Sequence, residues 1–185
     1  KDVFISLPIK KDSDYLNVAD RFLAENFELS RKKILAKITN NYRRAPFYDN
    51  IFPILEDIFN FEDKNLFHFT KNSISIINDY LSIYTPIIIS STIDIDHKLR
   101  GKVKVKAIVK KRNADVYINP IGGTQLYDTS DFKIDGIELK FIKTSNYKYP
   151  QFNNDFIPFL SIIDVLMFNE KSIIQDVILN KFTYE

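Results

Sequence analysis

The sequence predicts an α/β protein with a mostly parallel central sheet flanked by helices, folded as a single domain. Short apolar runs typical of buried strands alternate along the chain with longer segments of helical periodicity. The 185 residues suffice for one domain with a core, and 45% apolar with 27% charged residues is a globular composition. We find no internal repeat, low-complexity linker or domain boundary in the sequence, so residues 1–185 are taken as one domain.

Four short segments have the pattern of strands. In the first, Val3, Ile5 and Leu7 alternate with Phe4 and Ser6, so the segment is apolar on both faces for much of its length. The others are short, largely apolar runs next to proline or glycine. We expect strands at residues 3–7, 87–90, 115–119 and 137–142.

Three helical patterns fill the first half of the chain. Ser30 is a good N-cap for the first, which Pro46 stops, and Asp49 can cap the second. The third runs over residues 66–84. Apolar residues at three- and four-residue spacing define the buried faces. These are Ile34, Leu35, Ile38 and Tyr42 in the first helix, Leu55, Ile58 and Phe59 in the second, and Ile74, Ile77, Leu81 and Tyr84 in the third.

Residues 98–112 support two interpretations. Lys102, Lys104 and Lys106 alternate with apolar residues, which is the period of a strand, whereas Val105 and Val109 also fit one face of a helix. We predict a helix, because strands at 87–90 and 115–119 could then form a parallel pair joined by a crossover helix.

Towards the carboxyl end the sequence predicts two capped helices and a terminal one. Asp128 or Thr129 can cap a short helix that Gly136 closes. Ser161 and Asp164 resemble a capping box, although Asp stands where Glu or Gln is preferred. A last helix is expected near residues 172–180.

The strongest candidate for a site is the glycine pair Gly122–Gly123, directly after the predicted strand 115–119. Glycine permits positive φ or the close approach of a ligand, and in open α/β sheets ligands bind beyond the carboxyl ends of strands. The pair could hold a phosphate on backbone N–H groups. It could equally be a tight turn, because the chain has neither a P-loop nor a dinucleotide-binding motif.

Polar residues near this turn are candidates for binding and catalysis. Asn119 and Asp128 bracket it, and each could bind a sugar hydroxyl or amine, with Asp128 also a possible general base. The alternative is that Asn119 satisfies the turn backbone and Asp128 caps a helix. Tyr127 follows the turn, and Tyr149 and Gln151 lie in a later aromatic loop, which could contact a sugar or could cover the core.

Several classes of function are disfavoured. The chain has no cysteine, and its two histidines are far apart, so we expect no metal site. Asp94 and Asp96 before His97 could bind a metal or a metal–diphosphate, but we interpret them as a solvated acidic loop. The net charge of +2 and the lack of aromatics among the basic residues 98–112 disfavour nucleic-acid binding. No apolar run is long enough to span a bilayer and no secretory signal is visible, so we predict a cytoplasmic protein.

Several separated motifs can be recognised along the chain. They are residues 4–9 (FISLPI), 41–48 (NYRRAPFY), 117–128 (YINPIGGTQLYD), 136–139 (GIEL), 149–151 (YPQ) and 156–164 (FIPFLSIID). In order and spacing, over nearly the whole chain, these motifs resemble the WbqC-like protein family. Members of this family usually begin with a segment holding QPYLPW-like and RNR-like motifs, which this chain does not contain. The resemblance therefore implies that roughly a quarter of the family's length, its N-terminal segment, is missing here.

The resemblance also implies a function. The family is tied to gene clusters for surface polysaccharides of the O-antigen type, and a role in transferring an amino acid, glycine, to a sugar has been proposed for it. We therefore expect a transferase that attaches an aminoacyl or acyl group to a nucleotide-sugar or other glycan precursor, or else a sugar-binding accessory module without catalysis. Asp128 is the expected catalytic residue, and the expected substrate-binding residues are Asn119, Gly122, Gly123, Tyr127, Tyr149 and Gln151. The sequence identifies neither a cofactor nor an oligomeric state.

Overall fold

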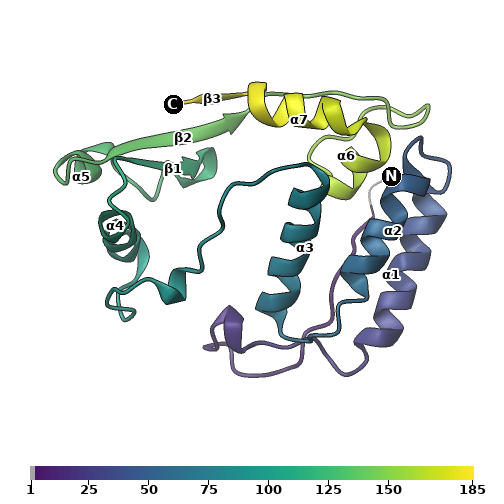
Figure 1. Cartoon of the computed structure of the whole chain (residues 1–185), viewed down its shortest axis with the longest axis horizontal. Coiled ribbons are helices and arrows are strands. Elements are labelled where there is room, and N and C mark those ends of the chain that lie inside the picture. Colours follow the sequence, from purple (N-terminus) through teal and green to yellow (C-terminus); the bar gives the residue numbers. More distant parts are fainter. Residues whose placement is uncertain (1–2) are drawn as a thin grey trace. The chain divides into compact units, whose positions relative to one another are not determined.

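The computed structural model describes residues 3–185, which divide into two compact units (Figure 1). The first unit consists of Lys1–Tyr84 and Lys148–Asp176, and the second of Thr85–Tyr147 and Val177–Glu185. Each unit is described by itself. The expectation of a single domain is not tested by this division and stays a prediction.

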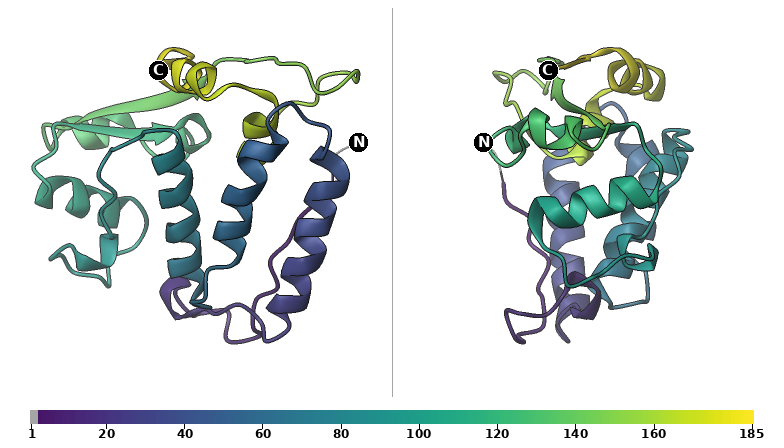
Figure 2. Two further views of the ribbon diagram at one scale, coloured as in Figure 1. Left: turned by 45° about the vertical axis from the view of Figure 1, so that its right-hand side comes forward. Right: turned by 90° about the vertical axis from the view of Figure 1, so that its left-hand side faces the viewer.

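The first unit is helical. It contains α1 (Phe27–Tyr42), α2 (Tyr48–Phe59), α3 (Leu66–Tyr80), α6 (Ile162–Phe168), the start of α7 (Lys171–Asn180) and the 3-10 turn η1 (Val18–Asp20). Helices α1, α2 and α3 lie alongside one another, as Figure 2 shows, and α6 packs against α2. The fully buried side chains of this unit are Phe27, Ile38, Ile51, Leu55, Leu81, Leu166, Met167 and Ile174.

The buried face was predicted correctly for the second helix, where Leu55, Ile58 and Phe59 are buried. The face predicted for the third helix is wrong in part, because Ile74 is 46% exposed and Tyr84 lies beyond the end of α3 and is 80% exposed. The predicted N-caps are wrong for the first two helices, because α1 begins three residues before Ser30 and α2 begins one residue before Asp49. A good capping residue can also lie within the first turn of a helix, so its type alone does not fix the start.

The predicted strand at residues 3–7 is not present. Residues 3–7 belong to no helix or strand, and strand-like pairing nearby occurs only further along, in an antiparallel bridge between Ile9 and Leu23. The side chain of Phe4 is 84% exposed. Alternating apolar residues favour an extended chain, but a strand also needs a neighbouring backbone to pair with.

The second unit holds a three-stranded sheet. Its strands are β1 (Val116–Pro120), β2 (Glu138–Thr144) and β3 (Phe182–Tyr184); its helices are α4 (Gly101–Lys111) and α5 (Thr129–Lys133), with 3-10 turns η2 (Ser90–Thr92) and η3 (Ile121–Gly123). Strands β1 and β2 are parallel, and β2 and β3 are antiparallel. The α/β class is therefore confirmed, but the sheet is small and mixed, not a mostly parallel central sheet.

The parallel pair is connected differently from the prediction. Residues 101–111 are helical, as expected. Residues 87–90, however, form no strand, and Ile87 and Ile88 are about half exposed. The crossover between the parallel strands β1 and β2 is made by η3 and α5, so α4 precedes the sheet instead of joining two of its strands.

A glycine sets the junction between α5 and β2. Gly136 has a φ of +72°, its N–H donates to the Lys133 carbonyl, and the Ile137 N–H donates to the Phe132 carbonyl. This pair of bonds is a Schellman motif, which needs a left-handed residue where Gly136 stands. The junction packs Phe132 and Ile137 into the core cluster that also contains Val109, Leu139 and Phe141.

Candidate functional site

A polar groove lies directly after the carboxyl end of β1. It has a volume of about 560 Å³, within the usual range of small-molecule sites. The chain segment that follows the glycine turn forms most of it, and one residue each comes from α4 and β2. The lining residues are Lys102, Thr124, Gln125, Leu126, Tyr127, Asp128, Thr129 and Phe141. Tyr127 and Asp128 are the predicted site residues that line this groove.

Gly123 packs closely against Asn119 and lies beside the groove residue Tyr127. Gly123 is buried, and a Cβ placed on it would lie 1.7 Å from Asn119 Nδ2 and 3.5 Å from Tyr127 Cδ2. Gly122 is exposed, and a Cβ there would meet nothing within 4 Å. Neither glycine has a left-handed φ. Only Gly123 of the pair is therefore required for close approach, because the Asn119 carboxamide occupies the space that a side chain at position 123 would need.

Two aromatic rings hold Tyr127 in place. The rings of Tyr117 and Phe132 are stacked with centroids 5.4 Å apart, and Tyr127 meets both edge-on at 5.9 Å. The Tyr117 hydroxyl donates to Asn119 Oδ1 at 3.2 Å. Burial, with the neighbouring Tyr127 phenol, raises the pKa of Tyr117 to about 12. This cluster fixes the ring that the groove presents to a ligand.

Asp128 caps helix α5. Its Oδ1 accepts from both the N–H and the hydroxyl of Ser130 at 2.8 Å, and these bonds lower the pKa of the Asp128 carboxyl. The capping role that the sequence suggested is thus present. A carboxyl with a lowered pKa is a weak proton acceptor near neutral pH, so the structure supplies no activation for the predicted general base.

The basic residues of α4 are largely paired within their own unit. Lys102 pairs with Asp131, Lys106 and Lys110 pair with Asp135, and Lys111 pairs with Asp94. Half of the eight basic residues between 98 and 112 therefore have a carboxylate partner, as a solvated helix face does. In the part of the chain that the structure describes, Lys102 is the only cation that lines the groove, and it is paired with Asp131.

Tyr149 and Gln151 lie in the first unit, where they surround Asp164. This carboxylate is 3% exposed. Its Oδ1 accepts from Tyr149 Oη at 2.7 Å and Gln151 Nε2 at 2.9 Å, and its Oδ2 accepts from Tyr42 Oη at 2.9 Å. Gln151 also exchanges hydrogen bonds with the backbone of Ile157. The polar groups of Tyr149 and Gln151 thus hold the loop onto α6, and their predicted contact with a substrate stays a prediction.

Sequence reasoning missed several residues of the groove and the buried carboxylate Asp164. The groove residues Thr124, Gln125 and Thr129 follow the glycine pair directly, so their position was a usable signal. The burial of Asp164 gave none, because its spacing from Ser161 is that of a helix cap. Ser161 is the N-cap of α6 and accepts from the Ile163 N–H at 3.3 Å, but Asp164 points into the core instead of completing a capping box.

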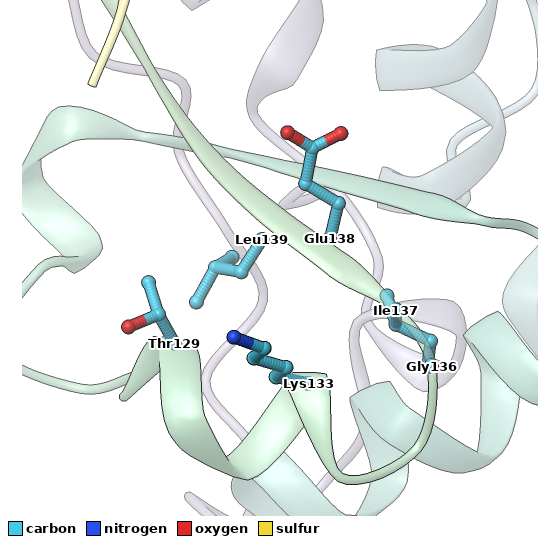
Figure 3. Close-up of a pocket in the computed structure, with 6 residues that line it drawn as sticks. All are labelled: Thr129, Lys133, Gly136, Ile137, Glu138 and Leu139. Atoms are coloured by element: carbon cyan, nitrogen blue, oxygen red, sulfur yellow. The ribbon is translucent and has the colours of Figure 1, made fainter.

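A second cavity adjoins the groove. It has a volume of about 370 Å³ and lies between α5 and the start of β2 (Figure 3). Its lining residues are Thr129, Lys133, Gly136, Ile137, Glu138 and Leu139. Thr129 lines both hollows, so the two share a border at the first residue of α5.

Comparison with protein families identifies the chain. The family model described as the WbqC-like protein family matches residues 1–176. The chain belongs to the WbqC-like protein family. The resemblance seen in the separated motifs is thereby confirmed, and both hollows of this WbqC-like chain lie within the matched range. Comparisons with curated proteins and with solved structures gave no match.

Two further properties of the WbqC-like chain bear on its chemistry. Among residues 3–185, no group of three or more His, Cys, Asp or Glu side chains is placed to hold a metal ion. Within the acidic loop, Asp94 pairs with Lys111 and the His97 ring contacts the Ile93 carbonyl at 3.0 Å. Over the same residues, every helix is too short or too polar to cross a bilayer.

Proposed function

We propose that this WbqC-like chain is a transferase of surface-polysaccharide biosynthesis that attaches an aminoacyl (glycine) or acyl group to an activated sugar. Family membership supports the connection to polysaccharide biosynthesis. The observation that carries the proposal is the groove at the carboxyl end of β1, because that edge is where α/β proteins bind their ligands.

The lining of the groove supports a sugar as its ligand. Hydroxyl, amide and carboxylate groups come from Thr124, Gln125, Asp128 and Thr129, and the ring of Tyr127 offers an aromatic surface with a hydroxyl. Such a combination suits a molecule that has many hydroxyls and an apolar ring face. Lys102 supplies the single positive charge at the edge.

In this proposal the predicted residues have separate roles. Tyr127 contacts the substrate, and Asn119 and Gly123 hold Tyr127 in position through their close packing. Gly122 leaves open space beside the turn for a phosphate. Asp128 is the carboxylate that lines the groove and the candidate general base. The proposal keeps the cytoplasmic location predicted from the sequence.

The test is product formation by the purified full-length protein. The protein is incubated with nucleotide-sugars, ATP and glycine or an acyl donor, and products are identified by mass spectrometry. The matched variants are Gln125→Ala in the groove and Asn153→Ala, an exposed polar residue of the first unit. We expect a product whose yield falls with Gln125→Ala and not with Asn153→Ala.

One observation favours a second candidate function, a sugar-binding accessory module without catalysis. The Asp128 carboxyl is held ionised by Ser130, and among residues 3–185 no other carboxylate lines the groove. Saturable sugar binding that Gln125→Ala weakens, without turnover in any mixture, would establish the accessory role. Absence of both binding and turnover would refute the two functions together.

A further inference from the structure

The cavity between α5 and β2, here the Lys133 cavity, combines an apolar floor with a single directed charge. Ile137 and Leu139 are 4% and 7% exposed and form its floor. In Figure 3 the Lys133 side chain extends towards Thr129 and Leu139, whereas Glu138 points away to the opposite face of β2. The cavity therefore presents one ammonium group beside two aliphatic side chains, whereas the Thr129 hydroxyl is drawn on the side of Thr129 away from Lys133.

The charge of Lys133 is uncompensated, unlike that of its neighbours. In the same unit, Lys102, Lys106, Lys110 and Lys111 each pair with a carboxylate of Asp94, Asp131 or Asp135. Among the residues that the structure describes, no carboxylate forms an ion pair with Lys133. Lys133 is thus the cation that both lines a hollow and is available to an anion from outside.

We propose that the Lys133 cavity binds a small molecule with one anionic group on a short aliphatic chain. The anionic group, a carboxylate or a phosphate, contacts the Lys133 ammonium, and the aliphatic chain packs on Ile137 and Leu139. A volume of about 370 Å³ accommodates such a molecule and is at the small end of the range for ligand sites.

The shared residue Thr129 gives this ligand a place in the proposed reaction. A transferase must hold two substrates side by side, and the Lys133 cavity borders the polar groove at Thr129. The anionic aliphatic molecule would then be the second substrate, or part of it, with the sugar in the groove. This assignment as a substrate rests on the proposed function, whereas the binding itself does not.

The test is a titration of the full chain followed by amide NMR spectra. Butanoate and butyl phosphate are added in separate experiments, with inorganic phosphate as a third probe. We expect saturable shifts confined to the amides of residues 129–139 with at least one of the two aliphatic probes, and weaker binding of inorganic phosphate. The aliphatic probe that binds tighter identifies the anionic group.

Two variants test the role of the charge. Lys133→Gln is expected to weaken binding about tenfold or more, because a hydrogen bond to a charged group is lost. Lys104→Gln removes a cation of α4 that lines neither hollow, and should leave binding unchanged. Equal binding by Lys133→Gln and the unaltered chain, equal affinity for inorganic phosphate and for the aliphatic probe that binds tighter, or the absence of any saturable shift would each overturn the proposal. Because the titration needs neither sugar nor turnover, its outcome is independent of product formation in the groove.

Discussion

Replacing Asp164 tests whether the buried carboxylate holds the aromatic loop in place. Asp164→Ala removes the acceptor of three donors, which are Tyr42, Tyr149 and Gln151. Gln151 keeps the Ile157 carbonyl at 3.1 Å as a second acceptor, so most of the loss falls on the two hydroxyls. Since a buried donor without a partner costs about 1–3 kcal/mol, we expect the free energy of unfolding to fall by about 2–5 kcal/mol.

The isosteric variant separates hydrogen bonding from packing. Asp164→Asn keeps one carbonyl oxygen in place, so its expected cost is only about 1–2 kcal/mol. Asp155→Ala removes an exposed carboxylate of the same loop and is the charge-matched control, with an effect within about 0.5 kcal/mol. Urea unfolding followed by far-UV circular dichroism measures all three. If Asp164→Ala unfolded at the same urea concentration as Asp155→Ala, the network around Asp164 would contribute nothing to the fold.

Three further predictions concern the second unit. Gly123→Ala should lower the free energy of unfolding by about 1 kcal/mol in urea, because the new Cβ displaces Asn119 from its hydrogen bond with Tyr117. Gly122→Ala should change this free energy little, and equal effects of the two substitutions would contradict the close-approach role of Gly123. Between pH 10 and about 12 the Tyr117 phenol ionises in the unfolded chain but stays protonated in the folded one, so stability should fall with rising pH, and less so in Tyr117→Phe. If stability fell equally in the unaltered chain and in Tyr117→Phe over this pH range, the ionisation of Tyr117 would not be its cause. Asp128→Asn keeps the cap on α5, so it should unfold at the same urea concentration as the unaltered chain, whereas Asp128→Ala should unfold at a lower urea concentration. Loss of the proposed group transfer in both variants would assign the carboxylate to catalysis.

Local signals in the sequence were reliable where short-range contacts decide the structure. The period of Leu55, Ile58 and Phe59 gave the buried face of α2, and Asp128, one of the two residues expected to cap the short helix, is its N-cap. Gly136 was placed correctly at the end of α5, because a Schellman motif requires only neighbouring residues.

Non-local pairing accounts for the errors. Residues 3–7 and 87–90 are apolar enough for strands but have no adjacent backbone to pair with, and the three-residue β3 is too short to show a period. The same limit applies to the candidate site. The sequence located the turn at Gly122–Gly123 and named Tyr127 and Asp128, but Lys102 and Phe141 reach the groove from other elements, and no spacing rule predicts that.

The alternation of side chains along β2 has a consequence for how accurately this strand must be aligned. Ile137 and Leu139 line one hollow and Phe141 the next, because every second residue faces the same way. A slip of one residue would exchange this apolar stripe for Glu138 and Lys140, and both hollows would acquire a charged base. The left-handed bend at Gly136 fixes where the strand starts, so an ordinary L-residue there would put at risk the cavity that Gly136 itself lines and also the groove, which it does not line.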